Sequence, residues 1–181
     1  MSLSKNNANI INIGEYTMIK IRQANIEDSN MYGEIHSNAW KQAYNNLFLS
    51  NYINQDSKEK RIASFINSMH NKNIQHFLCY YGDTAVGIIE ITYSFQEALC
   101  EINNLYILHD FCGRGIGKSI MDFVFNMAIK QGMQKIILWT LEANSLARRF
   151  YEDRGFKLSG NTRIIERGKE YIQVQYYKNI K

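Results

Sequence analysis

Apolar and polar residues alternate over residues 18–23, where Ile19 and Ile21 are separated by charged side chains. This period of two predicts a short strand. Beyond Glu27 the apolar residues recur every three to four positions, which predicts a helix with two adjacent side-chain stripes. One stripe carries Ile35, Ala39 and Ala43, and its neighbour carries His36, Trp40 and Tyr44.

A second helix is predicted from residue 56, where Asp56-Ser57-Lys58-Glu59 is typical of a capping box. Its apolar positions are Ile62, Phe65 and Ile66, and the pattern fades near His70. β-branched and aromatic residues then dominate as far as residue 107, with a turn signal at Gly82-Asp83. We therefore expect an antiparallel meander with strands at residues 75–81, 85–93 and 98–107.

The second half of the chain predicts both helices and strands. Apolar residues recur at helical spacing from Ile116 to Gln131, and Gly132 indicates the end of that helix. A buried strand at 135–141, a short helix at 144–154 and two strands around Gly168 follow. We predict a mixed α/β (α+β) fold. Its twisted, mostly antiparallel sheet would be flanked by helices, and one parallel β-α-β unit would carry a glycine loop.

The composition is that of a globular protein with one hydrophobic core. Of the 181 residues, 45% are apolar and 13% aromatic, so a single domain over residues 18–181 is expected. Residues 1–17 are polar and rich in asparagine, and we expect a leader that is flexible or partly of cloning origin. It lacks the basic start and the long apolar segment of a signal peptide.

Charge and cysteine content narrow the possible functions. The formal net charge is +4, but the basic residues are dispersed and form no stripe with aromatics, so nucleic-acid binding is not expected. Cys79, Cys100 and Cys112 form no C-x-x-C pair, and no histidine spacing predicts a metal site. Because no apolar run reaches about 18 residues, no membrane association is expected, and the unpaired thiols favour a cytoplasmic location.

The segment Phe111-Cys112-Gly113-Arg114-Gly115-Ile116-Gly117-Lys118 joins a predicted strand to a predicted helix. Its alternating glycines allow successive backbone N–H groups to face one point, and the helix start adds unpaired donors and a positive dipole end. The segment therefore predicts a phosphate-binding loop. A Walker A loop would need glycine at Cys112, and a dinucleotide-binding loop would need glycine at Lys118, so neither template fits.

Two motifs narrow the ligand further. The acyl-CoA pattern Q/R-x-x-G-x-G/A matches from residue 112 except at its first position, Cys112. The segment Asn144-Ser145-Leu146-Ala147-Arg148-Arg149-Phe150-Tyr151-Glu152-Asp153-Arg154-Gly155-Phe156 matches N-x-x-A-x-x-F-Y-x-x-x-G-F. On these motifs the chain resembles the GNAT superfamily of acyl-CoA-dependent N-acetyltransferases over roughly residues 18–177. The resemblance implies a GNAT-like fold and makes residues 18–181 an N-acetyltransferase domain.

The resemblance implies acetyl-CoA as cosubstrate, and the residue spacing predicts no metal. Backbone amides of about residues 112–118 would hold its pyrophosphate, with charge added by Arg114 and Lys118. Asn144 would contact the pantetheine arm, and a plain helix N-cap is an equally good and compatible interpretation. The residues expected to bind the donor are Leu105, Tyr106, Ile107, Cys112, Gly113, Arg114, Gly115, Ile116, Gly117, Lys118 and Asn144.

Cys112 has two interpretations. Its place beside a helix N-terminus favours the thiolate, but no His or Asp accompanies it as a nucleophile would require. We interpret it as a position that acts through its backbone, where the missing Gln or Arg side chain weakens donor binding without abolishing it.

The catalytic assignments also come from the resemblance. Tyr151 would protonate the departing coenzyme A thiolate, with a half-buried structural aromatic as the alternative. Glu101, eleven residues before Cys112, would act as general base through water; a structural surface carboxylate is the alternative, and Glu90 is the next candidate. The backbone near Leu105 would polarise the thioester carbonyl, and Ile107 would pair with pantetheine amides.

The acceptor site is less well defined by the sequence. In this family the first two helices and the last strand pair often line it. This arrangement points to His36, Trp40 and Tyr44, and to Tyr171 or Tyr176. For Trp40, a place in the apolar core is an equally good interpretation.

We therefore predict an N-acetyltransferase that moves acetyl from acetyl-CoA to a primary amine by direct attack in a ternary complex. The acceptor is a small molecule or a peptide. The sequence does not decide between a monomer and a homodimer. No base flanks any of the three cysteines, which argues against an acyl-cysteine intermediate. Alternatives are a non-catalytic acyl-CoA-binding sensor, a protein N-terminal acetyltransferase and a nucleotide triphosphate-binding protein.

Overall fold

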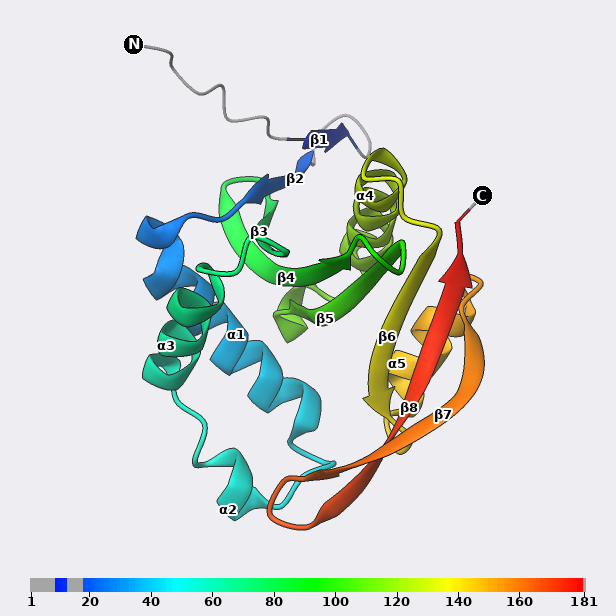
Figure 1. The fold of residues 1–181 in the computed structure, drawn as a ribbon. Helices are drawn as coiled ribbons and strands as arrows, with labels where there is room; N and C mark the ends of the chain where they lie inside the picture. The colour runs from blue at the N-terminus through cyan, green and yellow to red at the C-terminus, as the bar shows by residue number, and fades with distance from the viewer. Residues whose placement is uncertain (1–8, 13–17, 181) are drawn as a thin grey trace.

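The computed structural model describes residues 9–12 and 18–180, and a single mixed sheet runs through them (Figure 1). Within these residues the strand order is β1-β2-β3-β4-β5-β6-β8-β7, and every neighbouring pair is antiparallel except β5 with β6. The strands are β1 Asn9–Asn12, β2 Met18–Gln23, β3 Ile74–Tyr81, β4 Thr84–Ser94, β5 Leu99–Ile107, β6 Lys135–Leu141, β7 Lys157–Glu166 and β8 Glu170–Asn179. The mixed, mostly antiparallel sheet with one parallel unit is confirmed.

Helices cover both faces of this sheet. They are α1 Ser29–Tyr44, α2 Ser50–Ile53, α3 Lys58–Ser68, α4 Ile116–Lys130 and α5 Ser145–Glu152, with short 3-10 turns η1 Ile26–Asp28 and η2 His109–Phe111. α1 and α3 pack on one face against Leu78 and Ile88, and α4 packs on the other against their strand neighbours Phe77 and Ile89. The alternation of side chains along β3 and β4 thus supplies two separate cores.

The strand and helix predictions hold with local differences. α1 begins at Ser29, two residues after Glu27, because Asn25 caps the preceding turn η1 instead. Ser57 caps α3 by accepting a hydrogen bond from the Lys60 N–H at 3.3 Å. Ala43, predicted on one stripe with Ile35 and Ala39, is exposed, whereas the next residue, Tyr44, packs against Phe48 and Tyr106.

Three elements were not predicted as regular structure: β1, α2 and η2. β1 lies within the segment expected to be a leader and pairs antiparallel with β2. The rest of that leader, residues 1–8 and 13–17, lies outside the described residues. In the part of the chain that the structure describes, no helix has the length and apolar character needed to span a membrane.

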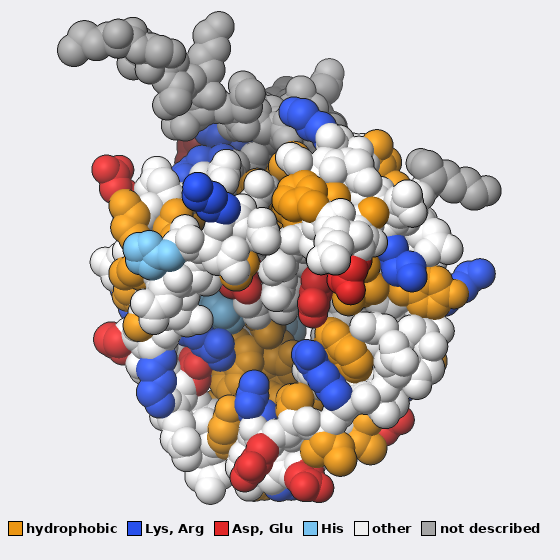
Figure 2. All heavy atoms as spheres, viewed as in Figure 1, with side chains coloured by type: hydrophobic (Ala, Val, Ile, Leu, Met, Phe, Trp, Pro, Cys, Tyr) orange, Lys and Arg blue, Asp and Glu red, His pale blue; other side chains and the backbone are white. Residues whose placement is uncertain are grey.

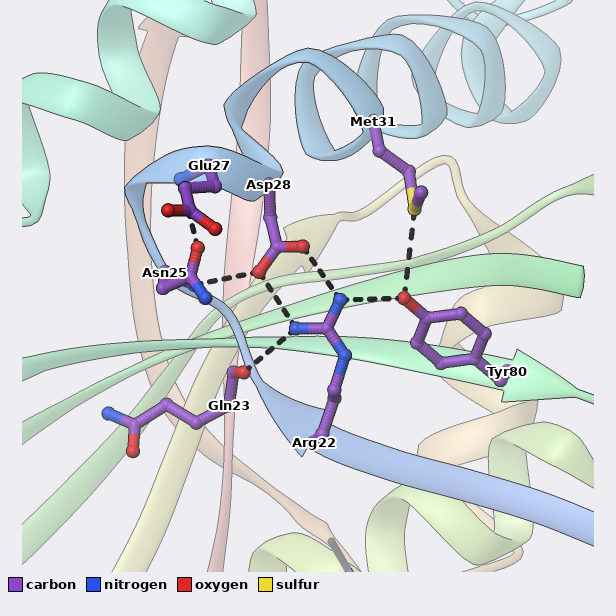
Figure 3. A network of polar contacts seen from close by, with 7 residues as sticks. All are labelled: Arg22, Gln23, Asn25, Glu27, Asp28, Met31 and Tyr80. Carbon is purple, nitrogen blue, oxygen red and sulfur yellow. Dashed lines mark hydrogen bonds and ion pairs between the residues drawn. The ribbon is translucent and has the colours of Figure 1, made fainter. Parts of the chain in front are cut away.

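A network of charged hydrogen bonds fixes the junction between β2 and α1 (Figure 3). Arg22 donates to both carboxylate oxygens of Asp28, from Nη1 at 2.8 Å and from Nη2 at 2.6 Å, and Nη2 also donates to the Tyr80 hydroxyl at 2.8 Å. Asp28 further accepts from the Asn25 N–H at 2.8 Å. The bonds from Arg22 lower the pKa of Asp28. The start of α1 is thereby held against the sheet.

Candidate active site

The centre of the site is a gap between two strands that begin as neighbours. β5 and β6 pair only from Leu99 to Ile102, yet β5 continues to Ile107 while β6 turns away and pairs with β8 as far as Leu141. Leu108 donates its N–H to Val86 on β4 at 2.9 Å. Because backbone groups alternate along a strand, those of Leu105 and Ile107 then point away from β4 and into the gap.

These free strand-edge groups lie where the sequence analysis expected the donor contacts. An unpaired N–H or C=O needs a partner, and an amide-containing chain laid along the edge of β5 would supply one. Leu105 and Ile107 therefore contribute backbone donors and acceptors to the site. Tyr106 points its side chain elsewhere, into the wall of a neighbouring cavity.

The glycine loop follows directly on η2 and leads into α4. Gly113 and Gly115 have φ of +78° and +80°, a conformation that an L side chain adopts only with strain. Nothing lies within 4 Å of a Cβ placed on Gly113. The first-turn N–H groups of α4, at Ile116, Gly117 and Lys118, have no acceptor within the helix. Open space in front of unpaired amides fits a phosphate group.

The side chains of the loop take different roles. Arg114 and Lys118 are exposed, with the Arg114 guanidinium 5.2 Å from the Phe111 ring centroid, so both cations lie at the surface of the loop. Ile116 is buried in the core and can serve a ligand only through its backbone. Gly117 has a packing role as well, since a Cβ there would lie 2.7 Å from Cε2 of Phe150 on α5.

Cys112 precedes the loop as an exposed residue, and its Sγ lies 3.7 Å from the Leu108 carbonyl oxygen. Partial burial raises the pKa of this thiol. Desolvation disfavours the charged thiolate, so burial acts against the effect that was expected from the nearby helix start. The Cys112 N–H already donates to the His109 carbonyl at 3.0 Å, so this amide is not free for a ligand.

α5 carries the second motif. Asn144 caps this helix, its side-chain oxygen accepting from the Ala147 N–H at 3.1 Å, as expected for a helix N-cap. Tyr151 lies two turns further on, half-buried against Phe150 and Phe156. Burial raises its pKa, with Tyr44 adding to the shift. The phenol therefore keeps its proton at neutral pH, and no hydrogen bond to another described residue occupies it.

A cavity of about 540 Å³ opens beside the gap, between α1, α3 and the strands β5 to β8. Figure 2 shows this hollow at the lower centre of the molecule, with apolar side chains inside and basic side chains around it. Its aromatic lining comprises Trp40, Tyr44, Phe48, Tyr52, Tyr106 and Trp139. Its charged lining comprises Asp56, Lys60, Arg61, Glu101, Arg163 and Arg167.

The structure brings Glu101, the predicted base, into this cavity together with Trp40 and Tyr44, two of the residues predicted to line the acceptor site. Burial raises the pKa of Glu101, and Arg163 opposes that shift. Trp40 is also buried among Phe48, Ile53 and Leu141, so its two interpretations are compatible. Glu101 reaches the cavity just before the β5–β6 pairing ends at Ile102.

Other predicted residues lie outside the cavity. His36 is buried behind Tyr106, with ring centroids 5.1 Å apart, and burial lowers its pKa to about 3. Glu90 lies 3.6 Å from Nδ1 of His76 on the neighbouring strand. His36 lies outside the cavity because its ring stacks on Tyr106 of β5, and Glu90 lies outside it because β4 is on the far side of β5.

Tyr171 and Tyr176, the two predicted aromatic residues on β8, also lie outside the cavity and at different places. Tyr176 is fully buried, accepting a hydrogen bond from Arg148 at 3.1 Å and donating one to Glu152. It therefore belongs to the packing of α5. Tyr171 packs edge-on against Phe48 at 4.8 Å, behind the cavity wall.

Four basic residues of the cavity were missed in the sequence: Lys60, Arg61, Arg163 and Arg167. The basic residues near the β7–β8 turn, Arg163 and Arg167 among them, are visible in the sequence, but their spacing does not indicate which side chains face the cavity. Among the described residues, no group of three or more His, Cys, Asp or Glu side chains is placed to hold a metal.

Comparisons with known proteins show which family this chain belongs to. Residues 38–156 match the family model described as the acetyltransferase (GNAT) family. The chain therefore belongs to that family and is an acetyl-CoA-dependent acyltransferase.

Individual relatives agree with this family assignment. A spermidine N(1)-acetyltransferase of Thermoplasma acidophilum is 26% identical over 166 residues, covering 89% of this chain and 99% of the relative. The crystal structure of the PaiA N-acetyltransferase from the same organism, in complex with coenzyme A, has a TM-score of 0.70 at 25% identity, covering 89% and 98%. A spermidine N-acetyltransferase from Vibrio cholerae, in complex with coenzyme A and spermine, has a TM-score of 0.71 at 17% identity, covering 90% and 95%. The last comparison shows the shared fold.

Proposed function

We propose that this protein transfers acetyl from acetyl-CoA to the primary amine of a small molecule by direct attack within a ternary complex. The observation that carries the proposal is the continuity of two regions. The gap at Leu105 and Ile107, where a donor can lie along β5, adjoins the cavity that holds Glu101. The reacting carbonyl would lie where these two regions join.

The donor would be held mainly by the backbone. The N–H groups of residues 113–118 would face its pyrophosphate, and the free edge of β5 would pair with the amides of its pantetheine arm. Asn144, as the cap of α5, would lie near that arm. The Leu105 N–H points into the gap and would polarise the thioester carbonyl as an oxyanion-hole donor does.

The chemistry then needs two proton transfers. An amine arrives as an ammonium with a pKa near 10, so a base must remove one proton before its nitrogen attacks the carbonyl carbon. Glu101, through a water molecule, would accept that proton. As the carbon–nitrogen bond forms and the carbon–sulfur bond breaks, Tyr151 would donate its phenolic proton to the sulfur.

A route through an acyl-cysteine has no support in the structure. Cys79 and Cys100 are fully buried, and burial raises the pKa of each thiol to about 12. Cys112 is exposed, but its pKa is raised too. Because the thiolate is the nucleophile, none of the three favours covalent catalysis.

A small-molecule acceptor agrees with the size of the cavity and with the relatives. A volume of about 540 Å³ is in the range of small-ligand sites. The names of the Thermoplasma acidophilum and Vibrio cholerae relatives give spermidine, an amine, as their acceptor.

Tyr151→Phe tests the proposal. We expect the affinity for acetyl-CoA to stay within about twofold and turnover to fall by roughly 10²-fold or more, the usual weight of general acid catalysis. Thiol release gives the rate, and calorimetric titration gives the affinity. Tyr177→Phe is the matched control, because it removes a half-buried phenol on β8 outside the site. Wild-type turnover at saturating amine in Tyr151→Phe would remove Tyr151 from the mechanism, and no thiol release with any amine would favour the acyl-CoA sensor.

A further inference from the structure

The acceptor cavity has an excess of positive charge. Four basic side chains line it, Lys60, Arg61, Arg163 and Arg167, against only two acidic ones, Asp56 and Glu101. Asp56 is committed to Arg61, with 2.6 Å between its Oδ1 and the Arg61 Nε. Glu101 is therefore the one acidic side chain of this lining left to face the other three cations.

None of those three cations forms a close ion pair with an acidic side chain among the described residues, although Arg163 is near enough to Glu101 to act on its pKa. Arg163 donates from Nε to Gln173 at 2.7 Å, Arg167 donates to the Glu166 carbonyl at 2.8 Å, and Lys60 donates to the Gln55 carbonyl at 2.6 Å. None of the ion pairs in the described part of the chain includes them. Both terminal nitrogens of Arg163 stay available for a charged ligand, which a guanidinium binds in a bidentate manner.

The aromatic lining does not offset this charge for a cationic ligand. Aromatic rings attract cations over their faces, and six such rings on their own would favour a polyamine. Yet the Arg61 guanidinium already lies 4.9 Å from the ring centroid of Trp40, and the Arg163 guanidinium lies 4.3 Å from that of Trp139. The protein's own cations occupy a face of each tryptophan, and they would repel a ligand ammonium there.

Resting on the proposed function, we propose that the acceptor is a small amine that also carries an anionic group, a carboxylate or a phosphate. Its amine would face Glu101 and the thioester, and its anion would be held by Arg163 and Arg167, with Lys60 adding charge. An apolar body between the two would pack on the aromatic wall. A polyamine, whose charges are all positive, would be a poor substrate.

The experiment measures thiol release with pairs of amines that differ mainly in the anion. The pairs are 4-aminobutyrate with butylamine, tyrosine with tyramine, and phosphoethanolamine with ethanolamine, and spermidine is included. We expect kcat/KM to be at least about tenfold higher for the anionic member of one or more pairs, since a hydrogen bond to a charged group has that weight. The carboxylate and phosphate pairs distinguish the two kinds of anion.

Variants connect that preference to the arginines. In Arg163→Gln and Arg167→Gln the ratio of kcat/KM between the anionic and the neutral member should fall about tenfold, and Arg163→Lys should keep part of it. Lys72→Gln, an exposed cation before β3, is the control with the same charge change and should keep the ratio. Arg163→Gln also removes the guanidinium that packs on Trp139. Arg167 lies in the turn between β7 and β8, so Arg167→Gln tests the effect of the charge on the ratio without that change in packing.

The outcomes separate the two proposals. Thiol release that is fastest with spermidine, or equal within every pair, would overturn the anionic acceptor while leaving acetyl transfer intact. An anion preference that both arginine variants keep would overturn the assignment of these residues. Binding of acetyl-CoA with no thiol release for any amine would overturn the proposed function and this inference with it.

Discussion

The donor side and the acceptor side of this site are built in different ways. In the proposed function, the donor side would use backbone groups of two short segments, the end of β5 with the glycine loop and the start of α5. The acceptor side uses side chains that the fold collects from Trp40 on α1 to Gln173 on β8. Backbone geometry depends on a few glycines, whereas a side-chain surface depends on every residue in it. The donor site should therefore tolerate substitution of its side chains, and the acceptor site should not.

The largest expected effect comes from an acceptor-side group, Glu101. In Glu101→Gln we expect kcat to fall by roughly 10²-fold or more, the weight of general base catalysis, with acetyl-CoA affinity unchanged. The base must be deprotonated, so kcat should rise with pH through its pKa. Since burial raises that pKa, the acid limb of the wild type should lie above the ordinary value near 4.3 for Glu.

Steady-state kinetics against pH would check this prediction. Glu97→Gln, an exposed carboxylate in the turn before β5, is the control and should keep both kcat and its pH profile. If Glu101→Gln retained the acid limb and the rate, the base would have to be a different group, and the donor and acceptor regions would not differ as described.

A second prediction concerns the support of the acceptor wall. Asp28→Asn removes the charge that Arg22 pairs with where α1 begins, and α1 carries Trp40. We expect the free energy of unfolding to fall by about 2 kcal/mol, the weight of hydrogen bonds to a charged group. The control Asp122→Asn removes an exposed carboxylate on α4.

The same pair predicts a pH dependence with a definite sign. The pKa of Asp28 is lowered in the folded state, so its contribution is complete above the ordinary value near 3.9 and is lost as pH falls through the folded-state value. Urea denaturation at pH 7 and under acidic conditions would measure this. Equal acid sensitivity of the wild type and Asp28→Asn would show that the pair contributes nothing to stability.

The difference between a backbone-built donor side and a side-chain-built acceptor side also explains how well each could be predicted from the sequence. The glycine loop and the cap Asn144 could be predicted because their geometry is local: alternating glycines and a helix start are adjacent in the chain. The strands could be predicted as well, since their period of two reflects burial on the sheet. β1 and α2, of four residues each, are too short to show a period.

The acceptor cavity could be predicted only in part. Trp40 and Tyr44 were found on one stripe of α1, but that stripe also contains His36, which lies under Tyr106 instead of in the cavity. Arg163 lies on a strand whose residues are nearly all exposed, so no burial pattern indicated that it faces inward. Tertiary packing decides such orientations, and spacing along the chain does not report it.

Glycine substitutions test the backbone character of the donor side. Gly115 and Gly132 bracket α4, with φ of +80° and +74°, so an alanine at either position would be strained in the same way. Gly115→Ala and Gly132→Ala should each lower the free energy of unfolding by about 1 kcal/mol, the cost of a left-handed conformation for an L residue. Only Gly115→Ala should weaken coenzyme A binding, by about fivefold, because it moves the first-turn amides. Equal weakening in both variants would indicate a general loss of structure in place of a local site.

The smallest effect is expected where the loop departs from its family pattern, at Cys112. If backbone amides bind the pyrophosphate, Cys112→Gln should tighten coenzyme A binding only about threefold, the weight of one exposed hydrogen bond, and Cys112→Ala should leave it within about twofold. The thiol should also react with iodoacetamide no faster than an ordinary exposed cysteine, because its pKa is raised. Calorimetric titration and alkylation rates measure these quantities. A change of tenfold or more in either substitution would mean that side chains carry the donor site too, and the contrast between the two halves of the site would then fail.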